Sequence, residues 1–335
     1  MNVLITGGAG YIGSHTFLAL TEAGHTVIIL DNFSNSERSI IGRLEAITGN
    51  EVFCVEGDVR CTELMVDALL THKIDSVIHF AGLKAVAESS LAPIEYYSNN
   101  VVGVISLLQA MQQANIKTLV FSSSATVYGE PSYLPLDESH PLNPTNPYGR
   151  TKLHVEEMLG DVARSDPSFG IVCLRYFNPI GAHISGLIGE DPRGIPNNLV
   201  PYITQVMAGR LEKLSIHGDD YETLDGTGVR DYIHIMDLAE GHVAALRYLK
   251  KAAGFEVFNL GTGHGYSVME VLNEFQKHAQ QNIPYVVHKR RVGDVAICFS
   301  DANKARKILH WTASRNLSDM CASSLGWQKF QAGLD

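Results

Sequence analysis

The alternation of two kinds of segment in the first half of the chain constrains its fold more than any other feature. Short apolar runs, which we expect to be strands, alternate with longer stretches of helical periodicity. The apolar runs are V-L-I (3–5), V-I-I-L (27–30), V-F-C-V (52–55), S-V-I-H-F (76–80), T-L-V-F-S (118–122) and I-V-C-L-R-Y-F (171–177). Near-continuous apolar strands separated by helices are typical of a parallel sheet covered on both faces. The alternation therefore predicts an α/β fold with a doubly wound parallel sheet.

A glycine-rich turn follows the first expected strand. The segment T-G-G-A-G-Y-I-G places Gly7, Gly10 and Gly13 in a G-x-x-G-x-x-G pattern that opens a helix. A dinucleotide pyrophosphate needs such a turn, because it must approach the backbone closely at the helix N-terminus. A flexible turn without a ligand is the alternative. Asp31 favours the dinucleotide, since it ends the second strand, where a carboxylate accepts hydrogen bonds from the adenine ribose.

The residues after Asp31 bear on the type of dinucleotide. The sequence continues D-N-F-S-N-S, and no arginine immediately follows the aspartate to pair with a 2′-phosphate. We therefore expect NAD rather than NADP as the cofactor. Asp58 ends the third strand, where it is placed either to meet the adenine edge or to serve as a helix N-cap.

The pattern of the chain changes after residue 178. Residues 180–198 are rich in Gly, Pro and His, which indicates a long ordered loop, and such loops in compact domains are usually functional. Further along, the run F-E-V-F-N-L (255–260) predicts a strand that returns to the first sheet. The expected domains are a NAD-binding Rossmann domain over 1–179, with a returning segment near 232–260, and a smaller C-terminal α/β substrate domain over 180–335.

A tyrosine and a lysine four residues apart form the candidate catalytic pair. Helical periodicity begins directly after Pro147, so Tyr148 and Lys152 share one helix face about 5–6 Å apart. The spacing alone is weak evidence, because Tyr285 and Lys289 share it. The first pair differs in its position, since it follows a run of serines that ends the fifth strand at the carboxyl edge of the sheet, where ligands bind.

Simple electrostatics supports a base role for Tyr148. The pKa of its phenol must fall by about 3 units for work near neutrality, roughly 4 kcal/mol. One ammonium group about 5 Å away supplies about 3 kcal/mol at an effective dielectric near 20. A positively charged nicotinamide can supply the remainder. We therefore predict a proton-transfer device of Tyr148 and Lys152, with Ser124 hydrogen-bonded to the same substrate hydroxyl.

Composition narrows the range of partners. The chain has 36 acidic and 26 basic residues and a net charge of −10, so no basic field attracts nucleic acid or an anionic membrane. No apolar run is long enough to span a bilayer, and the N-terminus enters a strand at once, without a signal peptide. Five cysteines without a CxxC pair, and histidines without HExxH, indicate reduced thiols and no metal centre. We expect a cytoplasmic protein.

Six longer segments resemble the UDP-glucose 4-epimerase family of the extended short-chain dehydrogenase/reductase superfamily. They are T-G-G-A-G-Y-I-G-S-H (6–15), H-F-A-G-L-K-A-V (79–86), F-S-S-S-A-T-V-Y-G (121–129), L-R-Y-F-N-P-I-G-A-H (174–183), G-E-D-P-R-G-I-P-N-N-L (189–199) and D-G-T-G-V-R-D-Y-I-H (225–234). The resemblance implies C4 epimerisation of UDP-glucose and UDP-galactose. Tyr148 would take the proton of the 4-hydroxyl while NAD takes the C4 hydride. The 4-keto sugar would then turn about its phosphate linkage and receive the hydride on its other face.

The resemblance also implies ligand contacts and an assembly. The implied cofactor contacts are Gly7, Gly10, Tyr11, Ile12, Gly13, Asp31, Asn32, Asn35, Asp58, Val59, Phe80, Ala81, Lys84, Asn99, Tyr148, Lys152 and Phe177. The implied UDP-sugar contacts are Ser124, Tyr148, Asn178, Asn198, Leu199, Arg230, Arg291, Asp294 and Cys298. Surface salt bridges are the alternative role for the two arginines. The family pairs long helices into a homodimer, and residues 93–114 are expected to form such a helix.

Cys298 bears on the range of sugars. Family members carry either a tyrosine or a small residue there, and the small residue implies a pocket that also accepts UDP-GlcNAc and UDP-GalNAc. Neighbouring side chains that refill the space are the alternative.

Two other functions compete with epimerisation. Sugar-nucleotide 4,6-dehydratases resemble the cofactor half, but they carry Asp-Glu where this chain has Ala125 and Thr126, and UDP-glucuronate decarboxylases keep a glutamate at the second position. A regulatory module that binds NAD without chemistry is the non-enzymatic alternative. Such a module need not keep Tyr148, Lys152 and Ser124 together.

Overall fold

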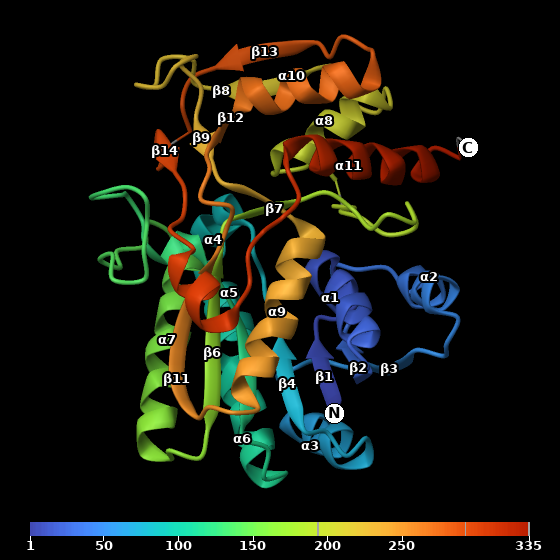
Figure 1. The fold of residues 1–335 in the computed structure, drawn as a ribbon, viewed down its shortest axis with the longest axis vertical. Helices are drawn as coiled ribbons and strands as arrows, with labels where there is room; N and C mark the ends of the chain where they lie inside the picture. Colours follow the sequence, from blue (N-terminus) through green and yellow to red (C-terminus); the bar gives the residue numbers. More distant parts are fainter. Residues whose placement is uncertain (193, 292, 334–335) are drawn as a thin grey trace.

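The structure is a computed structural model that describes residues 1–192, 194–291 and 293–333. Its lower half in Figure 1 is built on a seven-stranded sheet with the order β11-β6-β5-β4-β1-β2-β3, in which every neighbouring pair is parallel. The strands are β1 (Asn2–Thr6), β2 (Thr26–Asp31), β3 (Phe53–Glu56), β4 (Ser76–His79), β5 (Thr118–Ser124), β6 (Gly170–Tyr176) and β11 (Gly254–Leu260). The doubly wound sheet is thereby confirmed, including the strand that returns late in the chain.

Helices cover both faces of this sheet and enclose two apolar cores. One face carries α1 (Tyr11–Glu22), α2 (Ser39–Thr48) and α9 (Ile235–Leu249). The other carries α3 (Thr62–Thr71), α6 (Gly103–Gln113) and α7 (Pro147–Ser165). The strand order reverses between β1 and β4, and in such sheets ligands bind outside the carboxyl ends of the strands at that point.

The helix expected over 93–114 is divided into three pieces. They are α5 (Pro93–Tyr97), the π-helical turn η1 (Ser98–Val102) and α6, and the short helix α4 (Val86–Leu91) precedes them. Asn100 is buried at the π turn, where its amide donates to Leu83 O and Thr151 Oγ1 and accepts from Leu83 N. These bonds draw the helix toward α7, which explains the local widening.

A smaller α/β region lies at the carboxyl edge of the large sheet, in the upper half of Figure 1. Its strands are β7 (Asn178–Ile180) with β10 (Tyr232–His234), β9 (Val229–Arg230) with β12 (Tyr266–Ser267) and β14 (Ile297–Cys298), and β8 (Leu214–His217) with β13 (Tyr285–His288). Its helices are α8 (Leu199–Met207), α10 (Val268–Ala279) and α11 (Leu317–Gln331). Besides η1, the chain forms the short helical turns η2 (Ala125–Val127) and η3 (Ala305–Leu309). The strands and helices enclose a core of their own. A domain boundary near residue 179 stays a prediction.

The described part of the chain contains no helix long and apolar enough to cross a membrane.

Candidate active site

The glycine turn after β1 has the geometry that its sequence predicts. Gly7 has φ +67°, and a Cβ there would lie 2.7 Å from Ala81 N. A Cβ on Gly13 would lie 2.4 Å from Gly7 O, so both positions require glycine. No side chain caps the N-terminus of α1, and its first turn carries no acidic residue. The turn is therefore a cradle whose helix N–H groups can receive a phosphate.

Asp31 fixes this cradle from the end of β2. Its carboxylate is 8% exposed and accepts hydrogen bonds from Ala9 N at 3.0 Å, Phe33 N at 2.9 Å and Ser36 Oγ at 3.0 Å. A carboxylate offers about four acceptor sites, so capacity remains for a ribose hydroxyl. The position matches the predicted role of Asp31, and its contact with ribose stays a prediction.

Asp58 is not a helix N-cap, which excludes one of its two predicted roles. The N-cap of α3 is Cys61. Asp58 instead accepts hydrogen bonds from the side chains of Arg60, at 2.9 and 2.7 Å, and Asn32, at 3.2 Å. The bonds to Arg60 are the main cause that lowers the pKa of Asp58 to about 2. An ionised carboxylate therefore stands where the adenine edge is expected.

The other residues predicted to contact the cofactor lie around the carboxyl edge of the large sheet. Eight of them follow β1, β2, β3, β4 or β6: Tyr11, Ile12, Asn32, Asn35, Val59, Phe80, Ala81 and Phe177. Asn99 lies in the π-helical turn η1.

The predicted catalytic residues are brought together and buried. Tyr148, Lys152 and Ser124 are 9%, 5% and 8% exposed. Asn146 caps α7 by accepting a hydrogen bond from Gly149 N at 2.9 Å, and Pro147 occupies the first turn, so the helix begins as its sequence predicts. The second tyrosine–lysine pair does not share a helix face, because Tyr285 begins strand β13.

Lysine 152 is held by the strand that carries the serines. Its ammonium group donates to Ser122 O at 2.6 Å, and its Nζ lies 5.9 Å from the centre of the Tyr148 ring. Thr126 was not predicted to belong to the site. Its hydroxyl donates to Ser124 Oγ at 2.9 Å and thereby orients that hydroxyl.

Burial shifts the pKa values of both titrating groups in the pair. It raises the pKa of Tyr148, an effect that a hydrogen bond with Ser124 opposes. It lowers the pKa of Lys152 to about 8, and the charge of Glu156 acts in the opposite direction. The electrostatic argument from the sequence therefore overstates the fall in the pKa of Tyr148. It counts the attraction of the ammonium group and leaves out the cost of burying a phenolate.

A buried ion pair supports this centre, and the sequence analysis did not identify it. Glu156 and Arg175 are each 4% exposed and are joined by bonds of 2.6 to 3.1 Å. Ser123 Oγ also donates to Glu156, while Arg175 donates to Tyr128 OH at 3.2 Å. Glu156 follows Lys152 by one helical turn, and Arg175 interrupts an apolar strand. A charged residue within an apolar strand is the sequence signal that could have indicated this buried ion pair.

Apart from Ser124 on β5 and Tyr148 on α7, the residues predicted to hold a nucleotide sugar lie on the smaller region. Arg230 Nη2 lies 3.9 Å from Asp294 Oδ1, and Asp294 N donates to Arg291 O at 3.3 Å. Cys298 is the register partner of Arg230 on β14, half-buried near Phe177. Asn178 begins β7, Asn198 is the N-cap residue of α8, and Leu199 is the first residue of that helix. The structure therefore gathers two arginines and a carboxylate at one edge of the smaller region.

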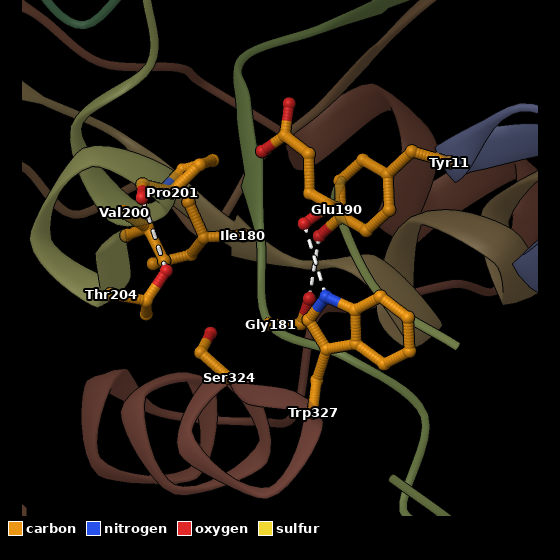
Figure 2. Close-up of a pocket in the computed structure, with 9 residues that line it drawn as sticks. All are labelled: Tyr11, Ile180, Gly181, Glu190, Val200, Pro201, Thr204, Ser324 and Trp327. Carbon is orange, nitrogen blue, oxygen red and sulfur yellow. Dashed lines mark hydrogen bonds between the residues drawn. The ribbon is translucent and has the colours of Figure 1, made fainter. Parts of the chain in front are cut away.

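Glu190 connects the two groups of predicted residues, and sequence analysis gave it no role. Its carboxylate accepts from Lys84 Nζ at 3.1 Å and from Asn198 Nδ2 at 2.7 Å. Figure 2 shows how its segment is held: the indole N–H of Trp327 donates to Glu190 O at 3.1 Å, and the Tyr11 hydroxyl donates to Gly181 O at 2.7 Å. These contacts fix residues 181–190 between α1 and α11. Arg193, in the same motif, lies outside the described residues.

Fold and site together define a class of protein: a dinucleotide-binding α/β enzyme with a buried tyrosine–lysine pair. The family model described as GDP-mannose 4,6 dehydratase matches residues 4–324. UDP-glucose 4-epimerase of Bacillus subtilis is 51% identical over 328 residues, which cover 98% of this chain and 97% of that protein. The chain belongs to the UDP-glucose 4-epimerase family.

Solved structures agree with this assignment. UDP-glucose 4-epimerase from Bifidobacterium longum in complex with NAD+ and UDP superposes with a TM-score of 0.95 at 53% identity, covering 98% of each chain. The UDP-Glc/GlcNAc 4-epimerase of Campylobacter jejuni superposes with a TM-score of 0.85 at 38% identity, covering 98% of this chain and 99% of that one. The family and the fold class predicted from the sequence are thereby confirmed.

Proposed function

We propose that the protein interconverts UDP-glucose and UDP-galactose by NAD-dependent epimerisation at C4. The observation that carries this proposal is the buried group of Tyr148, Lys152 and Ser124 at the carboxyl edge of the sheet, beside a glycine cradle. Ala125 and Thr126, which follow Ser124, offer no carboxyl group for the acid–base chemistry of a dehydratase at C5 and C6. The function is therefore that of the family's epimerases.

The cradle suits the proposed cofactor. Gly7 and Gly13 leave no room for a side chain, the N-terminus of α1 is uncapped, and Asp31 stands where a ribose is expected. When bound, NAD supplies the group that accepts the C4 hydride and returns it. Lys84, on the segment after β4, would add a positive charge to the same edge.

The chain's own residues then move one proton. The phenolate of Tyr148 accepts the proton of the sugar 4-hydroxyl and later returns it. The ammonium group of Lys152 stabilises that phenolate, and the Ser124 hydroxyl holds the reacting oxygen. Arg230 and Arg291 would bind the diphosphate, so that the 4-keto sugar can turn while its nucleotide stays in place.

We also propose that UDP-N-acetylglucosamine and UDP-N-acetylgalactosamine are substrates. Cys298 is a small side chain on β14, beside a cluster that contains Phe177, Val127, Tyr128 and Leu136. A tyrosine ring at this position would occupy the space that an acetamido group needs. The C. jejuni relative, whose name includes GlcNAc, is consistent with this range within the family.

Proton NMR of the sugar anomeric signals tests both proposals. Purified protein without added NAD receives UDP-galactose in one sample and UDP-N-acetylgalactosamine in another. We expect both C4 epimers to form, and we expect Cys298→Tyr to lose most turnover of the acetamido sugar while it keeps that of UDP-galactose. Unchanged acetamido turnover in this variant would contradict the pocket argument. A 4-keto-6-deoxy product would instead identify a dehydratase, and no turnover by a protein with bound NAD would favour a regulatory module.

A homodimer and a cytoplasmic location complete the proposal. Leu91 at the end of α4 and Ile94 on α5 are 87% and 84% exposed, and Val102 and Ile105, further along the chain, are also exposed. A second copy of the chain would cover this apolar face. Five free thiols, among them the exposed Cys61, suit a reducing compartment. Analytical ultracentrifugation of the wild type and of Ile94→Asp tests the dimer, since the variant should sediment as a monomer.

A further inference from the structure

A second pair of charges lies beside Asp31 at the carboxyl ends of β2 and β3. Asp31 and Glu56 are register partners on these parallel strands, so their side chains project from the same face of the sheet. Both guanidinium nitrogens at the end of Arg38 bond to the two carboxylate oxygens of Glu56. The guanidinium group also lies 4.7 Å from the ring centre of Phe33, whose N–H donates to Asp31.

This arrangement changes the argument about the cofactor type. No arginine immediately follows Asp31 in the sequence, but the chain turns before α2 and brings Arg38 back to the edge where a ribose is expected. The charges of Asp31, Glu56 and Arg38 all act on the thiol of Cys54. Burial is the main cause that raises the pKa of this thiol to about 11, the charges of Asp31 and Glu56 raise it further, and Arg38 opposes them. A cation suited to a 2′-phosphate is therefore present and already engaged.

The pair contributes little to the stability of the fold. The side chains of Arg38 and Glu56 are 64% and 52% exposed, and solvent screens ion pairs of this kind. The Arg38–Glu56 pair matters more for the binding of an incoming anion. A guanidinium fork fits phosphate in two-pronged geometry, and a ribose 2′-phosphate carries close to two negative charges at neutral pH.

We propose that Glu56 is a specificity-determining residue, which holds Arg38 in an ion pair and thereby excludes dinucleotides that carry a 2′-phosphate. With Glu56 in place, Asp31 and the pair together leave a net negative charge beside the ribose. Replacing Glu56 by glutamine removes one negative charge and frees the guanidinium fork. This inference rests on the proposed use of NAD.

The test compares the dinucleotides that purified proteins retain. Each holoenzyme is incubated with an equimolar excess of NAD and NADP, separated from free ligand and denatured, and its dinucleotides are quantified by mass spectrometry. We expect wild type to hold NAD almost alone. In Glu56→Gln the ratio of NADP to NAD should rise on the order of tenfold, the effect of one unit charge about 5 Å from a dianion in water.

Two further variants test whether the gain depends on the position of the removed charge and on the presence of Arg38. Glu51→Gln removes an exposed carboxylate from the segment before β3 and should keep the wild-type ratio. Arg38→Gln/Glu56→Gln should lose the gain in NADP, because the fork is absent. An unchanged ratio in Glu56→Gln, or an equal gain in the double variant, would overturn the inference. Wild type that retains no dinucleotide and has no epimerase activity would overturn the proposed function instead.

Discussion

The catalytic centre and the cations on the sugar side are held in different ways. Tyr148, Lys152 and Ser124 are each less than a tenth exposed and are supported by buried hydrogen bonds. The side chains of Arg230 and Asp294 are 21% and 38% exposed, and their charged atoms are 3.9 Å apart. The acid–base groups are thus buried and held by several hydrogen bonds, whereas the groups expected to bind the nucleotide sugar are more exposed, with Arg230 Nη1 donating to Val229 O at 2.9 Å.

This difference suits a reaction in which one sugar must present both faces. Proton transfer needs groups that are placed accurately, and burial together with the Glu156–Arg175 pair provides that order. A sugar that turns about its phosphate linkage needs a nucleotide site that keeps hold during the rotation. More exposed, longer side chains serve that purpose better than a rigid pocket does.

Tyr148→Phe should give the largest effect and should separate the two regions. The variant lacks the phenolic oxygen but keeps the ring, so we expect kcat to fall by about 10²–10⁴-fold while the Kd for UDP stays near that of wild type. Turnover of UDP-galactose measures the first quantity and isothermal titration with UDP the second. A near-normal kcat would remove Tyr148 from the base role, and a parallel loss of UDP affinity would show that the regions are not separable.

Glu156→Gln tests how much the buried ion pair beneath the catalytic centre contributes to stability. The change leaves the Arg175 charge buried without its partner, so we expect the free energy of unfolding in urea to fall by about 3–5 kcal/mol. The matched control is Asp161→Asn on the same helix, which breaks a pair with Arg164 whose side chains are both 74% exposed. We expect no measurable change there. Equal losses in both variants would contradict the difference between buried and exposed pairs.

Arg230→Gln tests the sugar side. We expect KM for UDP-galactose to rise by roughly ten- to a hundredfold, with a smaller change in kcat, because the lost contact acts on the diphosphate in the ground state and the transition state alike. Arg210→Gln, a charge-matched change in the exposed turn after α8, should leave both constants unchanged. A fall in kcat with unchanged KM would place Arg230 in the chemical step instead.

The two regions also differ in how far the sequence predicts them. In the large sheet, strands β1 to β4 are apolar runs that are each followed by a helix, so this alternation can be recognised from the local sequence, and Tyr148 and Lys152 lie one helical turn apart. The smaller region joins β9 to β12 and β14, which are 36 or more positions further along the chain and only two residues long. Contacts of that kind leave no periodic signal.

The same limit applies to individual side chains. Glu190 meets Lys84 across 106 positions and Trp327 across 137, and Glu156 meets Arg175 on a separate element. Motifs show which residue types are present, but the pairing of charges depends on how the segments pack. Burial around Tyr148 is a property of that packing as well, which is why an estimate from spacing alone misjudges its pKa.

The pH dependence should give the smallest effect and depends on Lys152. Because burial lowers the pKa of this lysine to about 8, it loses its proton in a range where an exposed lysine stays charged. The neutral amine no longer stabilises the Tyr148 phenolate, so kcat/KM should fall above about pH 8, up to tenfold per pH unit.

Lys152→Arg is the informative variant, since arginine keeps its proton throughout this range. Its absolute rate can be low, but the descending limb near pH 8 should be absent from its profile. Glu156 raises the pKa of Lys152, and Glu156→Gln should therefore move that limb to lower pH. If kcat/KM of Lys152→Arg still falls near pH 8, a group other than Lys152 causes the fall.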